Sequence, residues 1–364
     1  MDRPGTTALS SMKGTDRLLT LDAMRGIAAI CVMVTHVNVP GTPHLVGSGY
    51  LAVDFFFLLS GLVIAKTYGE RLTSGLSFGR FAAVRAIRIY PLYLVGFALG
   101  FVRCLGAMAL DRPDKLSAAQ LAVRTVFEPF LLPAPTSTGL FLLNGPAWSL
   151  FFELAINVVY ALLLVRCSTR VLVAVAAACG ALLVYVAMSQ GSLNVGQTWV
   201  TFHGGTARVG FSFVMGVIFA RLRWPPARDT GLALIPMALL VMVLVAHPAD
   251  ENRVAYDLVA VLVAAPVLVG LGAVFGPMPS LQRVSRLLGE LSYPIYAVHY
   301  PILWIFGYAA KKVGLPSVVW IPLFFAIVIC IALLLNKYWD VPVRRRLTAL
   351  LSKEARMAKA IHSA

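Results

Sequence analysis

Apolar runs of about 18 residues or more recur along this chain, and they constrain its fold more than any other feature. A run of this length can cross a bilayer as an α-helix, because the helix satisfies its own backbone hydrogen bonds. A transmembrane β-barrel would instead show short segments of alternating hydrophobicity. Only 13% of the 364 residues are charged, about half the share found in soluble proteins. The sequence therefore predicts an all-α, polytopic bundle of transmembrane helices.

We expect about ten membrane-spanning helices in a single membrane domain that covers residues 1–364. The predicted spans are residues 18–38, 49–66, 87–109, 145–165, 170–188, 205–221, 230–247, 254–274, 289–309 and 317–337. Residues 1–17 are expected to form a cytoplasmic tail, and residues 344–364 a basic cytoplasmic tail that lies on anionic lipid.

The distribution of positive charge predicts the orientation of these spans. With the N-terminus inside, 23 of the 31 Lys and Arg residues fall in inner segments and six in outer segments. Cytoplasmic loops carry such an excess, so we expect both termini inside. The net charge of +15 then reflects topology and anionic lipid, and no nucleic-acid partner is needed. The five cysteines fall mostly within apolar runs and show neither a disulfide framework nor metal-ligand spacing.

Two ionisable residues interrupt the first apolar run, LDAMRGIAAICVMVTHV. Arg25 and His36 are eleven residues apart, so they share one helix face about 16 Å apart along the axis. Such residues usually face a cavity or a partner. His36 is a candidate base or proton relay, because imidazole titrates near neutral pH. Two simpler interpretations stay open: Arg25 as a topology anchor, and His36 as a hydrogen-bonding partner of a neighbouring helix.

Asp54 lies at the outer end of the second span, in AVDFFFLLSGLVI. About ten residues join the first two helices, so they are expected to pack antiparallel, and Asp54 can then orient His36 as a carboxylate orients the base of a triad. A helix N-cap is an equal alternative for Asp54. Ser60 and Gly61 in the same span favour close helix packing.

Arg85 and Arg88 are three residues apart in FGRFAAVRAIRIYPLY, so they lie on one helix face at the cytoplasmic mouth of the third span. Two guanidinium groups on one face can hold a phosphate. A positive-inside anchor explains the same pair equally well.

Two further polar residues lie in apolar runs. Glu153, in NGPAWSLFFELAINVVY, needs a partner, and Arg25, His36 or an arginine of the third span can supply it; a structural ion pair is an equal interpretation. For His299, in LGELSYPIYAVHYPILWI, we expect a structural hydrogen bond between helices.

Together these residues resemble the acyltransferase-3 family of integral-membrane acyltransferases, and the resemblance runs from residue 21 to about 347. The motifs that carry it, in family order, are LDAMRGIAAICVMVTHV, AVDFFFLLSG, the arginine pair within FAAVRAIRIYPLY, WSLFFE, LGELSYPIYAVHYP and YWDVPVRRRL. Two positions depart from the usual pattern. Ala52 stands where glycine is common, and Phe151–Phe152 are bulkier than the usual residues, which can reshape an acceptor pocket.

The resemblance implies an O-acyltransferase that moves an acyl group, commonly acetyl, from cytoplasmic acyl-CoA to a hydroxyl of a glycan, lipid-linked sugar or other small acceptor. It implies His36 as the catalytic base and Arg25 as a support for the site. It places Arg85 and Arg88 where the family's paired arginines are thought to bind the donor. Glu153 matches the glutamate of the WSL motif. Acyl-CoA would be the co-substrate, and we expect no metal.

The main alternative is a secondary transporter or flippase, which ten spans with midplane ionisable residues would also suit. It predicts inverted repeats and paired broken helices, and the sequence shows neither. We expect the protein in a bacterial inner membrane, among its lipids. We expect no extracytoplasmic hydrolase-like domain, so a separate extracytoplasmic partner can complete the acyl transfer. The sequence names neither the acceptor nor the oligomeric state.

Overall fold

The computed structural model describes residues 18–37, 44–136 and 139–362. The predicted tail 1–17 lies outside them. In the part described the chain is predominantly helical. Its two strands, β1 (Arg228–Asp229) and β2 (Phe275–Gly276), are two residues long and pair in parallel. The all-α prediction is confirmed.

Thirteen α-helices follow one another along the described residues. They are α1 (Leu19–His36), α2 (Ala52–Thr73), α3 (Phe78–Ala109), α4 (Ala118–Phe127), α5 (Ala147–Leu162), α6 (Thr169–Gln190), α7 (Phe202–Arg221), α8 (Leu234–Val245), α9 (Asp250–Val259), α10 (Ala265–Val274), α11 (Pro279–Lys312), α12 (Ser317–Leu335) and α13 (Val341–His362). Two π-helical turns, Ala260–Ala264 and Asn336–Asp340, make α9 continuous with α10 and α12 continuous with α13. Every predicted span falls on a helix.

Six helical stretches among the described residues are long and apolar enough to cross a membrane. They are Leu19–His36, Gly49–Thr73, Phe78–Ala109, Thr169–Gln190, Asp250–Val274 and Ser317–Lys353. The stretches Ala147–Leu162 and Gly231–Val245 are apolar but shorter. A bundle of apolar helices is therefore established, whereas the count of ten spans and the cytoplasmic location of both termini stay predictions.

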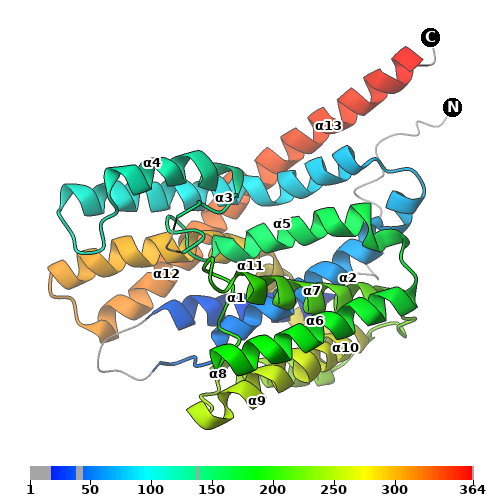
Figure 1. Cartoon of the computed structure of the whole chain (residues 1–364), viewed down its shortest axis with the longest axis horizontal. Coiled ribbons are helices and arrows are strands. Elements are labelled where there is room, and N and C mark those ends of the chain that lie inside the picture. The colour runs from blue at the N-terminus through cyan, green and yellow to red at the C-terminus, as the bar shows by residue number, and fades with distance from the viewer. Residues whose placement is uncertain (1–17, 38–43, 137–138, 363–364) are drawn as a thin grey trace.

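Most of the helices lie side by side along a common direction, whereas α12 and α13 form one oblique line whose end, α13, projects from the bundle (Figure 1). Within the bundle α1 runs parallel to α11. Arg25 near the start of α1 contacts Ser292 and Gly289, and His36 at its end contacts His299. The shared face predicted for Arg25 and His36 is confirmed, and it is the face that packs on α11.

α2 packs on α7 through glycines that allow the two backbones to approach closely. A Cβ built at Gly61 would lie 2.0 Å from the backbone oxygen of Phe213, and one at Gly216 would lie 2.1 Å from that of Leu58. No real side chain tolerates such distances. The close packing predicted around Gly61 is confirmed.

Gly61→Ala is therefore expected to destabilise the protein by about 1–3 kcal/mol, the usual effect of overpacking, because α2 and α7 must move apart. Thermal unfolding in detergent measures the change. Gly79→Ala is the matched control, because a Cβ there has no atom within 4 Å. Equal unfolding temperatures for Gly61→Ala and Gly79→Ala would contradict the packing argument.

Candidate active site

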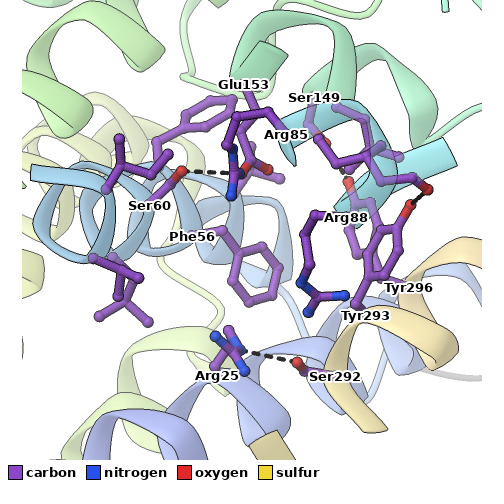
Figure 2. A pocket seen from close by; sticks show the side chains of 17 residues that line it. Arg25, Phe56, Ser60, Arg85, Arg88, Ser149, Glu153, Ser292, Tyr293 and Tyr296 are labelled. Carbon is purple, nitrogen blue, oxygen red and sulfur yellow. Dashed lines mark hydrogen bonds and ion pairs between the residues drawn. The ribbon is translucent and has the colours of Figure 1, made fainter. Parts of the chain in front are cut away.

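A pocket of about 170 Å³ opens among α1, α2, α3, α5 and α11 (Figure 2). Three arginines line it, together with an apolar wall and a few hydroxyl groups. The lining residues are Arg25, Val53, Phe56, Phe57, Leu59, Ser60, Val63, Ile64, Arg85, Arg88, Ile89, Ser149, Leu150, Glu153, Ser292, Tyr293 and Tyr296. Four of the six site residues predicted from the sequence, Arg25, Arg85, Arg88 and Glu153, thus meet in one pocket.

Glu153 on α5 is paired with Arg85 on α3. Arg85 Nη2 lies 3.0 Å from Glu153 Oε1, and Ser60 Oγ donates to the same oxygen at 2.9 Å. Of the three partners offered by the sequence, the arginine of the third predicted span is the one observed. The Arg85 side chain is only 12% exposed, and its buried Nε makes no hydrogen bond with the described residues. Arg85 therefore keeps a donor in addition to its ion pair.

Arg88 lies one turn further along α3 and is held more loosely. Its guanidinium carbon lies 5.2 Å from the centre of the Tyr293 ring, and its Nη1 lies 3.9 Å from Asp340 Oδ2. Arg344 Nη2 is closer to that same oxygen, at 2.7 Å. Since about a third of the Arg88 side chain is exposed, its charge is available at the pocket to an anion.

Arg25 faces these two arginines from the other side of the pocket (Figure 2). Its Nε donates to Ser292 Oγ at 3.0 Å and its Nη2 to the Gly289 oxygen at 2.9 Å, while Asp22 Oδ1 lies 3.3 Å from Nη2. These contacts aim the guanidinium at α11 and the pocket. Arg25 is therefore part of the pocket wall as well as a charge near a helix end.

His36 does not line this pocket; it lies beside a second histidine. His36 Nδ1 is 2.7 Å from the Val32 oxygen and 3.3 Å from Nε2 of His299, which is fully buried. The interhelical hydrogen bond predicted for His299 is confirmed, but the sequence did not identify His36 as its partner.

Tyr296 connects the pocket to the two histidines. Its side chain lines the pocket, its hydroxyl lies 2.6 Å from Ser149 Oγ, and its ring centre is 5.9 Å from that of His299. The Phe56 ring packs edge-on against it at 5.8 Å. The arrangement is therefore a cationic pocket with a tyrosine between it and a pair of imidazoles, of which His299 is fully buried and His36 partly buried.

Asp54 has a different partner from the one predicted. Arg208 on α7 contacts both carboxylate oxygens of Asp54, with Nη2 2.6 Å from Oδ2, and both side chains are fully buried. The predicted contact between Asp54 and His36 is wrong, because the guanidinium takes the carboxylate. Asp54 lies in the first turn of α2 but makes no side-chain cap there. The signal for this pair was Arg208 itself, an arginine within an apolar run that must find a partner.

Among the described residues, no group of three or more His, Cys, Asp or Glu side chains is placed to hold a metal ion. The charged groups of the pocket are suited instead to bind an anion, and the imidazole pair to move a proton.

Comparison with known proteins gives a family match over most of the chain. A family model described as an acyltransferase domain matches residues 18–337, which include all six predicted site residues. The chain is 39% identical over 166 residues to "Protein 2 in picA locus" of Rhizobium radiobacter. This match covers 42% of the chain and 84% of that protein.

Two other relatives carry functional names. Acyltransferase MdmB of Streptomyces mycarofaciens is 31% identical over 156 residues, covering 40% of this chain and 39% of that protein. Putative peptidoglycan O-acetyltransferase YrhL of Bacillus subtilis is 24% identical over 371 residues, covering 89% of this chain and 54% of that protein. The chain thus spans only part of the length of these two relatives. No solved structure matches.

Proposed function

This chain belongs to the acyltransferase-3 family and is an O-acyltransferase with membrane-spanning helices, and we propose that its donor is acyl-CoA, with acetyl as the favoured acyl group. The acceptor would be a hydroxyl of a glycan, a lipid-linked sugar or another small molecule. One observation carries the proposal: a pocket with three arginines is also lined by Tyr296, which lies beside the His36–His299 pair.

The arginines are suited to the anionic end of the donor. Coenzyme A carries its phosphates at one end and the thioester at the end of a long flexible arm. Guanidinium groups bind phosphate strongly, because their hydrogen bonds are charge-assisted and can be bidentate. Arg85 and Arg88 are close on α3, and Arg25 faces them, so the phosphates would bind here and the arm would run along the apolar wall toward Tyr296.

His36 would act as the general base. Its Nε2 would take the proton of the acceptor hydroxyl as that oxygen attacks the thioester carbonyl carbon. The carbon–sulfur bond then breaks, and the departing thiolate takes the proton back from the imidazolium. An ester and free CoA result, and His36 returns to its neutral form. Arg25 and the Glu153–Arg85 pair would hold the donor in place, and Asp54 would support the site through its ion pair with Arg208.

The setting of the reaction follows from the predicted topology. Ten spans with both termini inside would put the arginine pocket at the cytoplasmic end of the bundle, where acyl-CoA is found. The three relatives are bacterial proteins, which supports a bacterial inner membrane. An extracytoplasmic partner can receive the acyl group where the final acceptor lies outside.

Release of CoA from acetyl-CoA by the detergent-purified protein tests the proposal, with a panel of glycan and lipid-linked sugar acceptors. The expected result is release that depends on one acceptor class, with mass spectrometry of the acceptor showing one added acetyl group. Uptake of an acceptor into proteoliposomes without any acylation would favour the transporter instead.

Arg88→Gln is expected to raise the KM for acetyl-CoA about tenfold and to change kcat little, because one charge-assisted contact to phosphate is lost while the acyl end is untouched. Initial rates at saturating acceptor measure both constants. Lys66→Gln is the control, because Lys66 is exposed, lies at the same predicted membrane face and does not line the pocket. Equal KM values in the two variants would remove Arg88 from the donor site.

A further inference from the structure

We propose that His299 is a positioning residue that holds His36 in the tautomer whose Nε2 is unprotonated and free to act as a base. The inference rests on the proposed function for its catalytic meaning, but the tautomer itself follows from the geometry. The reaction steps proposed above assign no role to His299. It is fully buried on α11, and its Nε2 lies 3.3 Å from His36 Nδ1.

The protonation of His299 is set by its own helix. Its Nδ1 lies 3.0 Å from the Ile295 oxygen and 2.9 Å from the Tyr296 oxygen. Carbonyl oxygens only accept hydrogen bonds, so Nδ1 must carry the hydrogen. A neutral imidazole has a single N–H, and no carboxylate among the described residues contacts this buried ring to stabilise a cation. Nε2 of His299 therefore presents a lone pair to His36.

His36 must then carry its own hydrogen on Nδ1. That nitrogen faces two acceptors, the Val32 oxygen at 2.7 Å and the His299 lone pair at 3.3 Å. With the hydrogen on Nε2 instead, the Nδ1 lone pair would be directed at both acceptors, which is repulsive. The two acceptors together leave Nε2 of His36 as the basic nitrogen. They also stabilise the imidazolium that forms when Nε2 takes a proton, as a carboxylate does in a triad.

The position of His299 is itself fixed by the surrounding helices. Pro301 has no N–H, so it cannot donate to the oxygen of Ala297 four residues before it. Asn144 Nδ2 donates to that oxygen instead, at 2.8 Å. This bond ties α11 to the segment before α5 within one turn of His299. Tyr296, whose oxygen bonds His299 and whose side chain lines the pocket, links the same turn to the donor site.

Three variants separate positioning from packing. His299→Phe keeps an aromatic ring but has no acceptor, and His299→Gln keeps an oxygen at about the place of Nε2. We expect kcat to fall about 100-fold in His299→Phe, with the KM for acetyl-CoA within twofold of wild type. The loss should stay below the about 10⁴-fold cost of a wrong tautomer in a protease triad, because Val32 still accepts. His299→Gln should recover kcat to within about tenfold of wild type. His203→Gln, at an exposed histidine of α7, should change nothing.

A second measurement does not depend on activity. The chain has six histidines, so ¹⁵N NMR of histidine-labelled protein in detergent can be assigned by single variants. We expect His36 to show a protonated Nδ1 and an unprotonated Nε2 in the wild type, and a mixture of tautomers in His299→Phe. If the wild type transfers no acyl group yet shows this pattern, the proposed function fails and the positioning role stands. A wild-type His36 protonated on Nε2, or His299→Gln as inactive as His299→Phe, would overturn the positioning role.

Discussion

His36→Ala is expected to lower acceptor-dependent release of CoA by about 10³-fold, within the range that general bases contribute. The variant removes the only nitrogen that the structure leaves free to accept a proton at the imidazole pair, because His299 uses its lone pair toward His36. It should leave the arginine pocket intact, since His36 does not line that pocket. Binding of acetyl-CoA should therefore persist, and initial rates together with equilibrium binding of the donor measure the two effects.

The control is His203→Ala, which truncates an exposed histidine on α7. Both variants should be found in the membrane fraction in equal amount, because neither substitution introduces a charge into an apolar helix. Full transferase activity in His36→Ala would exclude this residue as the base. A variant that lost donor binding as well would show that His36 maintains the pocket rather than the chemistry.

The positions of the helices could be read from the sequence because membrane helices are local features. Each predicted span is an apolar run bounded by polar or turn residues, and each falls on a helix. The π-turn Ala260–Ala264 inside the eighth predicted span could not be foreseen, because the run through it is uniformly apolar. Length and composition identify six helices among the described residues that are able to span a membrane. The prediction of ten spans therefore still rests on the apolar runs of the sequence, and the orientation of the spans on the distribution of positive charge.

Which site residues contact one another was harder to predict from the sequence, because the partners lie on helices that are far apart along the chain. Arg85 and Glu153 are separated by 68 residues, and spacing along one helix says nothing about which neighbouring helix supplies the partner. The sequence offered three partners for Glu153, and packing selected one. His299 was identified as an intramembrane histidine with a bond between helices, but only the parallel packing of α1 on α11 brings it to His36.

The choice of Asp54 as the partner of His36 failed for a physical reason. The connection between α1 and α2 suggested proximity, but a buried carboxylate is stabilised far more by a guanidinium than by a neutral imidazole. Arg208 was present in the sixth predicted span, and an intramembrane arginine also requires a counter-ion. A buried carboxylate and a buried guanidinium each avoid being an unpaired charge by forming an ion pair. Asp54 and Arg208 therefore meet although 154 residues separate them.

The buried Asp54–Arg208 pair predicts a large change in stability when one partner is removed. Both side chains are fully buried, and Arg208 also donates to the Val195 oxygen at 3.0 Å and to the Tyr50 oxygen at 2.7 Å. Arg208→Met would leave the Asp54 carboxylate buried without its cation, and removing one partner of a buried pair costs about 3–5 kcal/mol. The buried thiols of Cys31 and Cys104 report unfolding, since a thiol-reactive dye reaches them only when the bundle opens.

The double variant Asp54→Leu/Arg208→Met distinguishes two quantities. One is the destabilisation caused by a buried charge without a partner, and the other is the net stabilisation that the ion pair provides. Replacing both charges with apolar groups of similar volume is often neutral or stabilising. We therefore expect the unfolding temperature of the double variant to be well above that of Arg208→Met. Lys115→Met is the exposed counterpart: its pair with Asp111 is 47% and 84% exposed, and its loss should cost less than about 1 kcal/mol. If Arg208→Met unfolded at the temperature of Lys115→Met, the pair would hold α2 to α7 no more firmly than a surface contact. The contact between the two helices would then rest on their apolar packing, including the close approach at Gly61 and Gly216.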